Sequence, residues 1–162
     1  MPTEVARFFV EGEPRPQGSK TPVRRGTKII LIEGTGSNPA RHKAWRSSVA
    51  DTTREFMAEH DLDELDCAAR VELRFKMPRP KSRHKLIRAV TVKPDIDKLV
   101  RAVLDGLTSS DKVGTLLLKD DSRVVELYAE KYYHPKGSEE PIGVEVAVFD
   151  ISDRARFDEL SS

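Results

Sequence analysis

The stretch KPDIDKLVRAVLDGL, residues 93–107, decides the fold. Its apolar residues recur at spacings of three and four, which places them along one face of an α-helix. A proline followed by an aspartate is typical of a helix start, so the pattern predicts a helix over Asp95–Leu107. A helix with one apolar face has to bury that face, and we expect it to pack on a sheet. The residues of this face are Ile96, Leu99, Val100, Val103, Leu104 and Leu107.

The rest of the chain predicts several strands and one further helix. Apolar, β-branched runs between glycine- and proline-rich breaks predict strands over Glu4–Glu11, Lys28–Glu33, Cys67–Met77, Ser122–Tyr133 and Ile142–Ile151. The spacing of Trp45, Val49 and Phe56 predicts a helix over Pro39–His60, with Asn38 as its cap. A chain of 162 residues fits one compact domain, which we expect over residues 1–151, followed by a charged tail over residues 152–162 that frays.

Composition excludes several classes of protein. Hydrophobic residues make up 38% of the chain and charged residues 34%, which is typical of a soluble globular protein. The chain has no long apolar run, so we expect no signal peptide and no membrane anchor, and a cytosolic protein. Its single cysteine, Cys67, has no partner for a disulfide or a cysteine-based zinc site, and its four histidines are scattered.

The net charge of +1 conceals a strong separation of charge along the chain. Residues 74–93 hold eight Lys or Arg and no acid, and residues 15–46 hold eight more against the single acid Glu33. A basic run of this kind is usually a solvated loop. Beside an acidic cluster, it favours a surface that binds the phosphate backbone of a nucleic acid.

Two pairs of aspartates flank the helix expected at residues 95–107. Asp95 and Asp97 lie in or beside its first turn, where an acid commonly stabilises the helix by about 1 kcal/mol. Taken singly, either residue fits that structural role best. The second pair, Asp120 and Asp121, precedes an expected strand, and its presence favours a metal site over a purely structural role. Four carboxylates could hold two Mg²⁺ ions, which prefer oxygen ligands and can stabilise both the attacking and the leaving oxygen of a phosphodiester.

The stretch KPDIDKLVRAVLDGLT at residues 93–108, followed by KDDSRVVEL at residues 119–127 and by Lys131, resembles the RusA-like family of Holliday junction resolvases. The segment GEPRPQGSK at residues 12–20 is similar to the Pro- and Lys-rich loop near the start of phage-borne members. The resemblance implies an α+β fold of one domain, with a mixed β-sheet packed by about two main helices. It also implies a homodimer that makes paired nicks across four-way junction DNA.

The resemblance further implies the metal and its ligands. The cofactor is expected to be Mg²⁺, with Mn²⁺ as a substitute and two ions per site. Asp95, Asp97 and Asp121 match the metal-binding carboxylates of the family, and Asp120 is their neighbour. A phage or prophage origin is plausible on the same grounds.

Two residues depart from the family's pattern. Lys98 stands where the family usually has Asn, and its position opposite the apolar face favours solvent exposure over DNA contact. Arg101 replaces a more familiar Lys; it could hold a phosphate through two N–H groups but cannot act as a proton donor. The connection Ser109–Leu118 is longer than expected, so the choice of Asp121 over Asp120 as ligand depends on the Asp-Asp-Ser-x-Val match.

These patterns predict a metal-dependent endodeoxyribonuclease that resolves four-way junctions in DNA recombination and repair. The expected catalytic residues are Asp95, Asp97, Asp121 and Arg101. The expected DNA contacts are Arg15, Lys20, Arg79, Lys81, Arg83, Lys85, Lys93, Lys98 and Lys131. The dimer surface is open, and the apolar strand Val144–Ile151 is one candidate.

Two alternative functions remain. The first is a nuclease of the same fold that cuts flaps or ordinary duplex. The second is a DNA-binding or assembly protein in which the aspartates only cap helices and form ion pairs.

Overall fold

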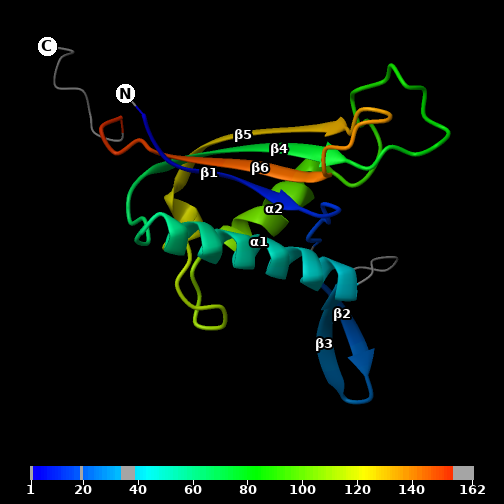
Figure 1. Cartoon of the computed structure of the whole chain (residues 1–162). Coiled ribbons are helices and arrows are strands. Elements are labelled where there is room, and N and C mark those ends of the chain that lie inside the picture. Colours follow the sequence, from blue (N-terminus) through cyan, green and yellow to red (C-terminus); the bar gives the residue numbers. More distant parts are fainter. Residues whose placement is uncertain (1, 19, 34–38, 155–162) are drawn as a thin grey trace, which may run out of the picture.

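The computed structural model describes residues 2–18, 20–33 and 39–154, with the backbone alone at residues 20–23 and 31–33. A four-stranded mixed sheet forms the centre, in the order β1 (Thr3–Glu11), β6 (Gly143–Asp150), β4 (Ala69–Met77) and β5 (Val124–Tyr133). β4 and β5 are parallel, and the other neighbours are antiparallel. Two helices, α1 (Pro39–Glu59) and α2 (Ile96–Leu107), cover one face of this sheet (Figure 1). The expected α+β fold, mixed sheet and two main helices are confirmed.

The boundaries of most elements are close to those expected. α2 begins one residue later than predicted, with Asp95 at the N-cap position. The strand expected from Ser122 begins at Val124, after a 3-10 turn, η1 (Asp121–Arg123). One strand was not expected: β2 (Lys20–Arg25) pairs with β3 (Lys28–Glu33) in a separate hairpin. The expected cap Asn38 and the tail beyond residue 154 lie outside the described residues.

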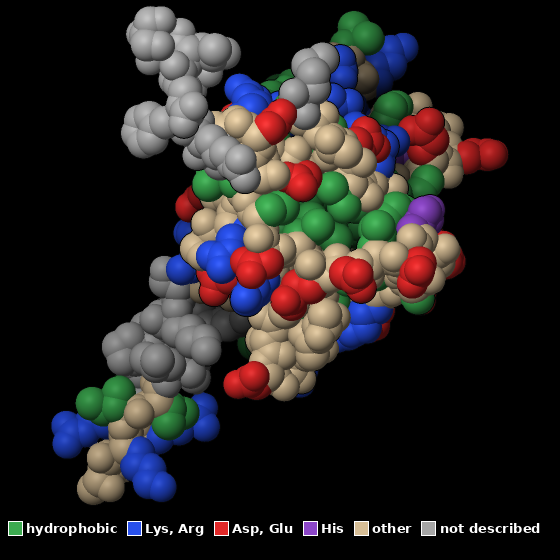
Figure 2. All heavy atoms as spheres, turned by 90° about the vertical axis from the view of Figure 1, so that its left-hand side faces the viewer, with side chains coloured by type: hydrophobic (Ala, Val, Ile, Leu, Met, Phe, Trp, Pro, Cys, Tyr) green, Lys and Arg blue, Asp and Glu red, His purple; other side chains and the backbone are tan. Residues whose placement is uncertain are grey.

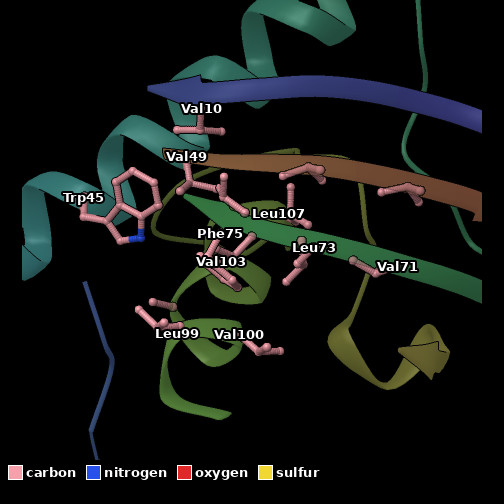
Figure 3. Close-up of a cluster of buried hydrophobic side chains, with 14 of the residues drawn as sticks. Val10, Trp45, Val49, Val71, Leu73, Phe75, Leu99, Val100, Val103 and Leu107 are labelled. Carbon is pink, nitrogen blue, oxygen red and sulfur yellow. The ribbon is translucent and has the colours of Figure 1, made fainter. Parts of the chain in front are cut away.

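The core forms because β4 alternates strictly between its two faces. Ala69, Val71, Leu73, Phe75 and Met77 are buried on the face covered by the helices, where they meet the apolar stripe of α2 (Figure 3). The α2 residues at this contact include Leu99, Val103 and Leu107, all fully buried.

α1 packs against α2 at a very close approach. A Cβ added to Gly106 of α2 would lie 2.5 Å from Cγ1 of Val49 on α1, so only glycine fits there without a shift. Trp45 lies one turn earlier on α1 and closes the same core (Figure 3).

The other face of the sheet carries charged side chains and is solvated. Arg7 pairs with Glu145 at 2.6 Å, and Arg74 pairs with Glu130 at 3.5 Å. β6 is an interior strand, hydrogen-bonded to β1 on one side and to β4 on the other. Its valines at positions 144, 146 and 148 are in the core. The strand Val144–Ile151 therefore has no free edge or apolar face for a partner, and we discard it as the dimer surface.

The segment from β4 through α2 to β5 is a parallel crossover, and it sets where the functional residues lie. α2 runs back along the sheet, antiparallel to the two strands that it connects. After α2 the chain makes a loop whose residues Leu116–Leu118 return to the core and are fully buried. The described part of the chain has no helix with the length and apolar character needed to cross a membrane.

Candidate active site

The first turn of α2 presents two carboxylates to solvent. Asp95 occupies the N-cap position with an extended backbone (φ −68°, ψ 141°), but its side chain accepts no capping hydrogen bond. Asp97 follows in the first turn and is exposed, with no hydrogen bond or ion pair to another described residue. Among the described residues, Asp95 has one charged partner, Lys98, whose Nζ lies 3.6 Å from Oδ2 of Asp95 with both side chains about half exposed. A capping role therefore does not account for Asp95.

Neighbouring segments fix the position of this turn. Lys131 of β5 donates from Nζ to the carbonyl oxygens of Val92 at 2.9 Å and Pro94 at 2.7 Å. From the other side, the backbone N–H of Gln17 donates to the carbonyl oxygen of Lys98 at 3.0 Å. Lys131, expected as a DNA contact, thus has its amine hydrogen-bonded to the backbone just before Asp95.

A pocket of about 640 Å³ opens directly beside Asp95. The loop at residues 13–18 forms one wall and the segment Val90–Pro94 forms another, and Lys98 lies at its rim. Arg15 faces this pocket but is ion-paired with Glu13 at 2.8 Å. The side chain of Lys20, also expected to contact DNA, lies outside the described residues.

The basic loop at residues 78–93 borders the same end of the sheet. Arg79 has a structural role there, because it donates to the carbonyl oxygens of His84 at 2.8 Å and of His134 at 3.0 Å. Arg83 is half-buried, with its guanidinium 5.8 Å from the centre of the Tyr133 ring. Lys81, Lys85 and Lys93 are exposed and form no ion pair with a described residue. Arg88 is also exposed, with its guanidinium 4.8 Å from the centre of the Tyr132 ring and no ion pair to a described residue, so it and these three lysines are the exposed loop cations that carry no internal ion pair or carbonyl bond.

Asp120 and Asp121 lie in η1, before β5. The carboxylate of Asp120 accepts a hydrogen bond from the backbone N–H of Ser122 at 2.8 Å, and hydrogen bonds from Ser122 lower the pKa of Asp120 below its ordinary value. Asp121 is exposed. Nearby, Asp66 pairs with Lys119 at 2.9 Å and with Arg123 at 2.8 Å, and these hydrogen bonds lower the pKa of Asp66.

Within one chain, the two pairs of aspartates are far apart. Asp95 begins α2, whereas the segment leading to Asp120 and Asp121 bonds to the end of α2, with the N–H of Leu118 donating to the carbonyl of Leu107 at 2.9 Å. A helix of 12 residues is about 18 Å long, so no single ion can touch both pairs. No group of three or more potential ligands is gathered among the residues described. Arg101, one turn after Asp97, is exposed along α2.

The two ends of the sheet also differ in charge. The end that carries η1 faces the viewer in Figure 2, where acidic side chains surround a small apolar patch. The opposite end carries the first turn of α2, the basic loop and the basic hairpin of β2 and β3 (Figure 1). The basic side chains of the loop and the hairpin therefore gather at the end that carries Asp95 and Asp97.

Comparison with known proteins agrees with the resemblance found in the sequence. The family model described as "Endodeoxyribonuclease RusA" matches residues 11–148, which include both pairs of aspartates. The chain is also 31% identical over 162 aligned residues to the "Uncharacterized protein YqaN" of Bacillus subtilis (strain 168), with 92% of this chain and 99% of that protein covered. The chain belongs to the RusA family of endodeoxyribonucleases.

Proposed function

We propose that this protein is a metal-dependent endonuclease that resolves four-way DNA junctions as a homodimer, and that two chains contribute to each active site. Membership of the RusA family supports the endonuclease activity. One observation carries the two-chain site: α2 separates Asp95 and Asp97 from Asp120 and Asp121 by about the length of the helix. A second chain related by two-fold symmetry can bring its Asp121 to the Asp95 end of the first.

The residues of the α2 turn fit a hydrated Mg²⁺ ion. Mg²⁺ prefers carboxylate oxygens, keeps several waters and is commonly held by one or two carboxylates. Asp95 and Asp97 are exposed and are separated by one residue. The side chain of Asp95 makes no capping hydrogen bond that would compete with a metal ion. Divalent ions at such a site supply a nucleophilic hydroxide and neutralise charge at the phosphate. Asp121 of the second chain, with Asp120 beside it, would complete the ligand set for two ions, Mg²⁺ or Mn²⁺.

The edge of the sheet at β5 supports this arrangement. Val125 and Leu127 of β5 are 61% and 50% exposed, although both side chains are apolar. They lie between the two carboxylate pairs along β5, where the helices leave the strand uncovered. Burial of exposed apolar side chains against their copies would be favourable, and a two-fold axis there would make the contact self-complementary.

DNA binding in this proposal relies on cations that are not used inside the chain. Lys81, Lys85 and Lys93 border the α2 turn and would hold the backbone beside the cleaved phosphate. Arg101 would orient a phosphate through two N–H groups. Lys131 acts indirectly in this scheme, by fixing the backbone that leads to Asp95.

Cleavage of labelled four-way junction, flap and duplex with different metals tests the proposal. We expect cleavage of the junction in Mg²⁺ or Mn²⁺, and binding with little turnover in Ca²⁺, because Ca²⁺ accepts more ligands at longer distances. Full activity in excess EDTA would contradict the metal requirement. Preferential cutting of the flap or duplex would identify the alternative nuclease, and binding without cleavage of any of the three would favour the assembly protein.

Two sets of substitutions separate chemistry from binding. Asp97→Asn keeps the shape of the side chain and removes a charge, so it should leave junction affinity in Ca²⁺ equal or higher and reduce single-turnover cleavage by orders of magnitude. Replacing Lys81, Lys85 and Lys93 together with Ala should weaken binding and make its salt dependence less steep by about 2–3 units of the logarithmic slope. Cleavage by Asp97→Asn at the unmutated rate would refute the assignment of the site.

A further inference from the structure

The hairpin of β2 and β3 projects away from the body of the protein (Figure 1). Each strand has six residues, and the pairing runs from Lys20 with Glu33 to Arg25 with Lys28. The two residues between Arg25 and Lys28 form the turn, and Gly26 has φ +63°, a conformation suited to glycine at the first position of a tight hairpin turn. No other described helix or strand packs broadly against it.

The tip of the hairpin is basic and solvated. Arg24, Arg25 and Lys28 are exposed, and none of them forms an ion pair with a described residue. Ile29, paired across from Arg24, is 73% exposed. Glu33 is the single acid between Glu13 and Asp51. A two-stranded hairpin that buries so little apolar surface is marginal in isolation, so its contribution to the stability of the core is small.

The base of the hairpin lies at the active-site turn. The N–H of Gln17 donates to the carbonyl of Lys98 at 3.0 Å, and β2 begins three residues after Gln17. The hairpin therefore starts beside the helical turn that carries Asp95 and Asp97. It extends from the active-site end of the molecule, where the basic loop is also located (Figure 1).

From this placement, we propose that the hairpin is a DNA-binding arm that lies along the duplex leading away from the cleaved phosphate. Six residues of strand reach about 20 Å, which corresponds to about six base pairs. A two-stranded ribbon fits the major groove, and the three cations can meet phosphates on its borders. The arm rests on the proposed function, because it places the cleaved phosphate at Asp95 and Asp97.

Charge favours DNA over a second copy of the chain as the occupant. The exposed tip offers three cations and one apolar side chain, which matches a phosphate backbone and offers a protein surface little area to bury.

Binding to junctions whose arms differ in length tests the arm. The variant R24A/R25A/K28A is compared in Ca²⁺, over a salt series, with the unmutated protein on junctions whose arms range from about 4 to about 16 base pairs. On long arms we expect weaker binding and a logarithmic salt slope that is smaller by about 2–3, because about 0.9 counterions are released for each phosphate neutralised. On arms shorter than the reach of the hairpin, the two proteins should bind alike.

A matched control removes three cations from other surfaces. R7A/R54A/K112A takes one arginine from the charged face of the sheet, one arginine from α1 and a lysine from the loop after α2, so it should leave the salt slope unchanged at every arm length. The conservative variant R24K/R25K keeps the charges and should retain most of the binding. Far-ultraviolet circular dichroism and thermal unfolding check that R24A/R25A/K28A keeps the fold.

Two results would contradict the proposal that the hairpin is a DNA-binding arm. One is a loss of affinity that does not depend on arm length, and the other is a shift of R24A/R25A/K28A to a different oligomeric state by sedimentation. Failure of the arm and failure of the proposed function are distinguishable. If the junction is cleaved normally and the hairpin substitutions have no effect on binding, the arm alone is refuted. If the hairpin substitutions weaken binding in a way that depends on arm length but no metal-dependent cleavage occurs, the proposed function alone is refuted.

Discussion

A mixture of two inactive variants should recover cleavage if each active site is built from two chains. In Asp97→Asn every site lacks a carboxylate at the start of α2, and in Asp121→Asn every site lacks one from η1. A hybrid dimer contains one of each chain. Its first site then receives both substitutions, whereas its second site combines an unmutated Asp97 with an unmutated Asp121 and is intact.

The size of the recovery follows from the geometry. If subunits exchange at random, about half of the dimers are hybrids and each has one intact site of two, so nicking should reach about a quarter of the unmutated rate at equal protein concentration. The product should also be distinctive. A hybrid dimer cuts one strand of the junction and not the opposite one, so nicked junctions should accumulate instead of resolved duplexes.

The assay is single-turnover cleavage of a junction labelled on two opposite strands, with the variants mixed before DNA is added. A mixture of Asp95→Asn with Asp97→Asn serves as the control. Both substitutions affect the same end of α2, so every site in the hybrid keeps a defect and no recovery is expected. If Asp97→Asn and Asp121→Asn fail to complement although sedimentation shows hybrid dimers, the carboxylates do not act across two chains and the reasoning from helix length is refuted.

Three further predictions follow from individual contacts. Gly106→Val should lower the free energy of unfolding in urea by about 1–3 kcal/mol through its clash with Val49, whereas Gly18→Ala, with nothing within 4 Å of its added Cβ, should change it little. Lys131→Met should raise the Mg²⁺ concentration needed for cleavage without changing the salt slope of binding; a smaller slope would mean that the amine contacts phosphate. Burial, with Asp150 nearby, raises the pKa of the Cys67 thiol, so its alkylation should be slow at neutral pH. The alkylation rate should stop rising only above the pH typical of a free cysteine, and a plateau at or below that pH would contradict this prediction.

Local sequence signals predicted most of the fold correctly because local and tertiary preferences agree there. The apolar period of residues 95–107 predicts the buried face of α2. Four of its six members are buried in the core and the other two, Ile96 and Leu104, are partly buried against it. Alternation predicts β6, and the prolines after Met77 end β4.

β2 was missed because Pro22 interrupts its pattern, and a proline within a run argues against an interior strand. In a two-stranded hairpin both strands are edges, so a missing N–H can face solvent. The signal that could have revealed the hairpin is the Arg-Gly-Thr-Lys turn before the β-branched run of β3. The structural roles of Lys131 and Arg79 cannot be predicted from sequence spacing, because each side chain donates a hydrogen bond to a carbonyl oxygen that is distant in sequence.

The sequence identifies the candidate ligands but not the distance between the two pairs. Closeness in sequence to α2 does not specify at which end of that helix each pair lies. The parallel pairing of β4 with β5 determines it. A parallel crossover has to return the chain to the start of the first strand before the second strand can begin. Residues just before α2 and residues just before β5 therefore lie at opposite ends of the sheet, however long the connecting loop is. Shortening Ser109–Leu118 could not join the two pairs of aspartates, whereas a second chain can, and a dimeric site is thus the arrangement that this topology favours for a shared metal.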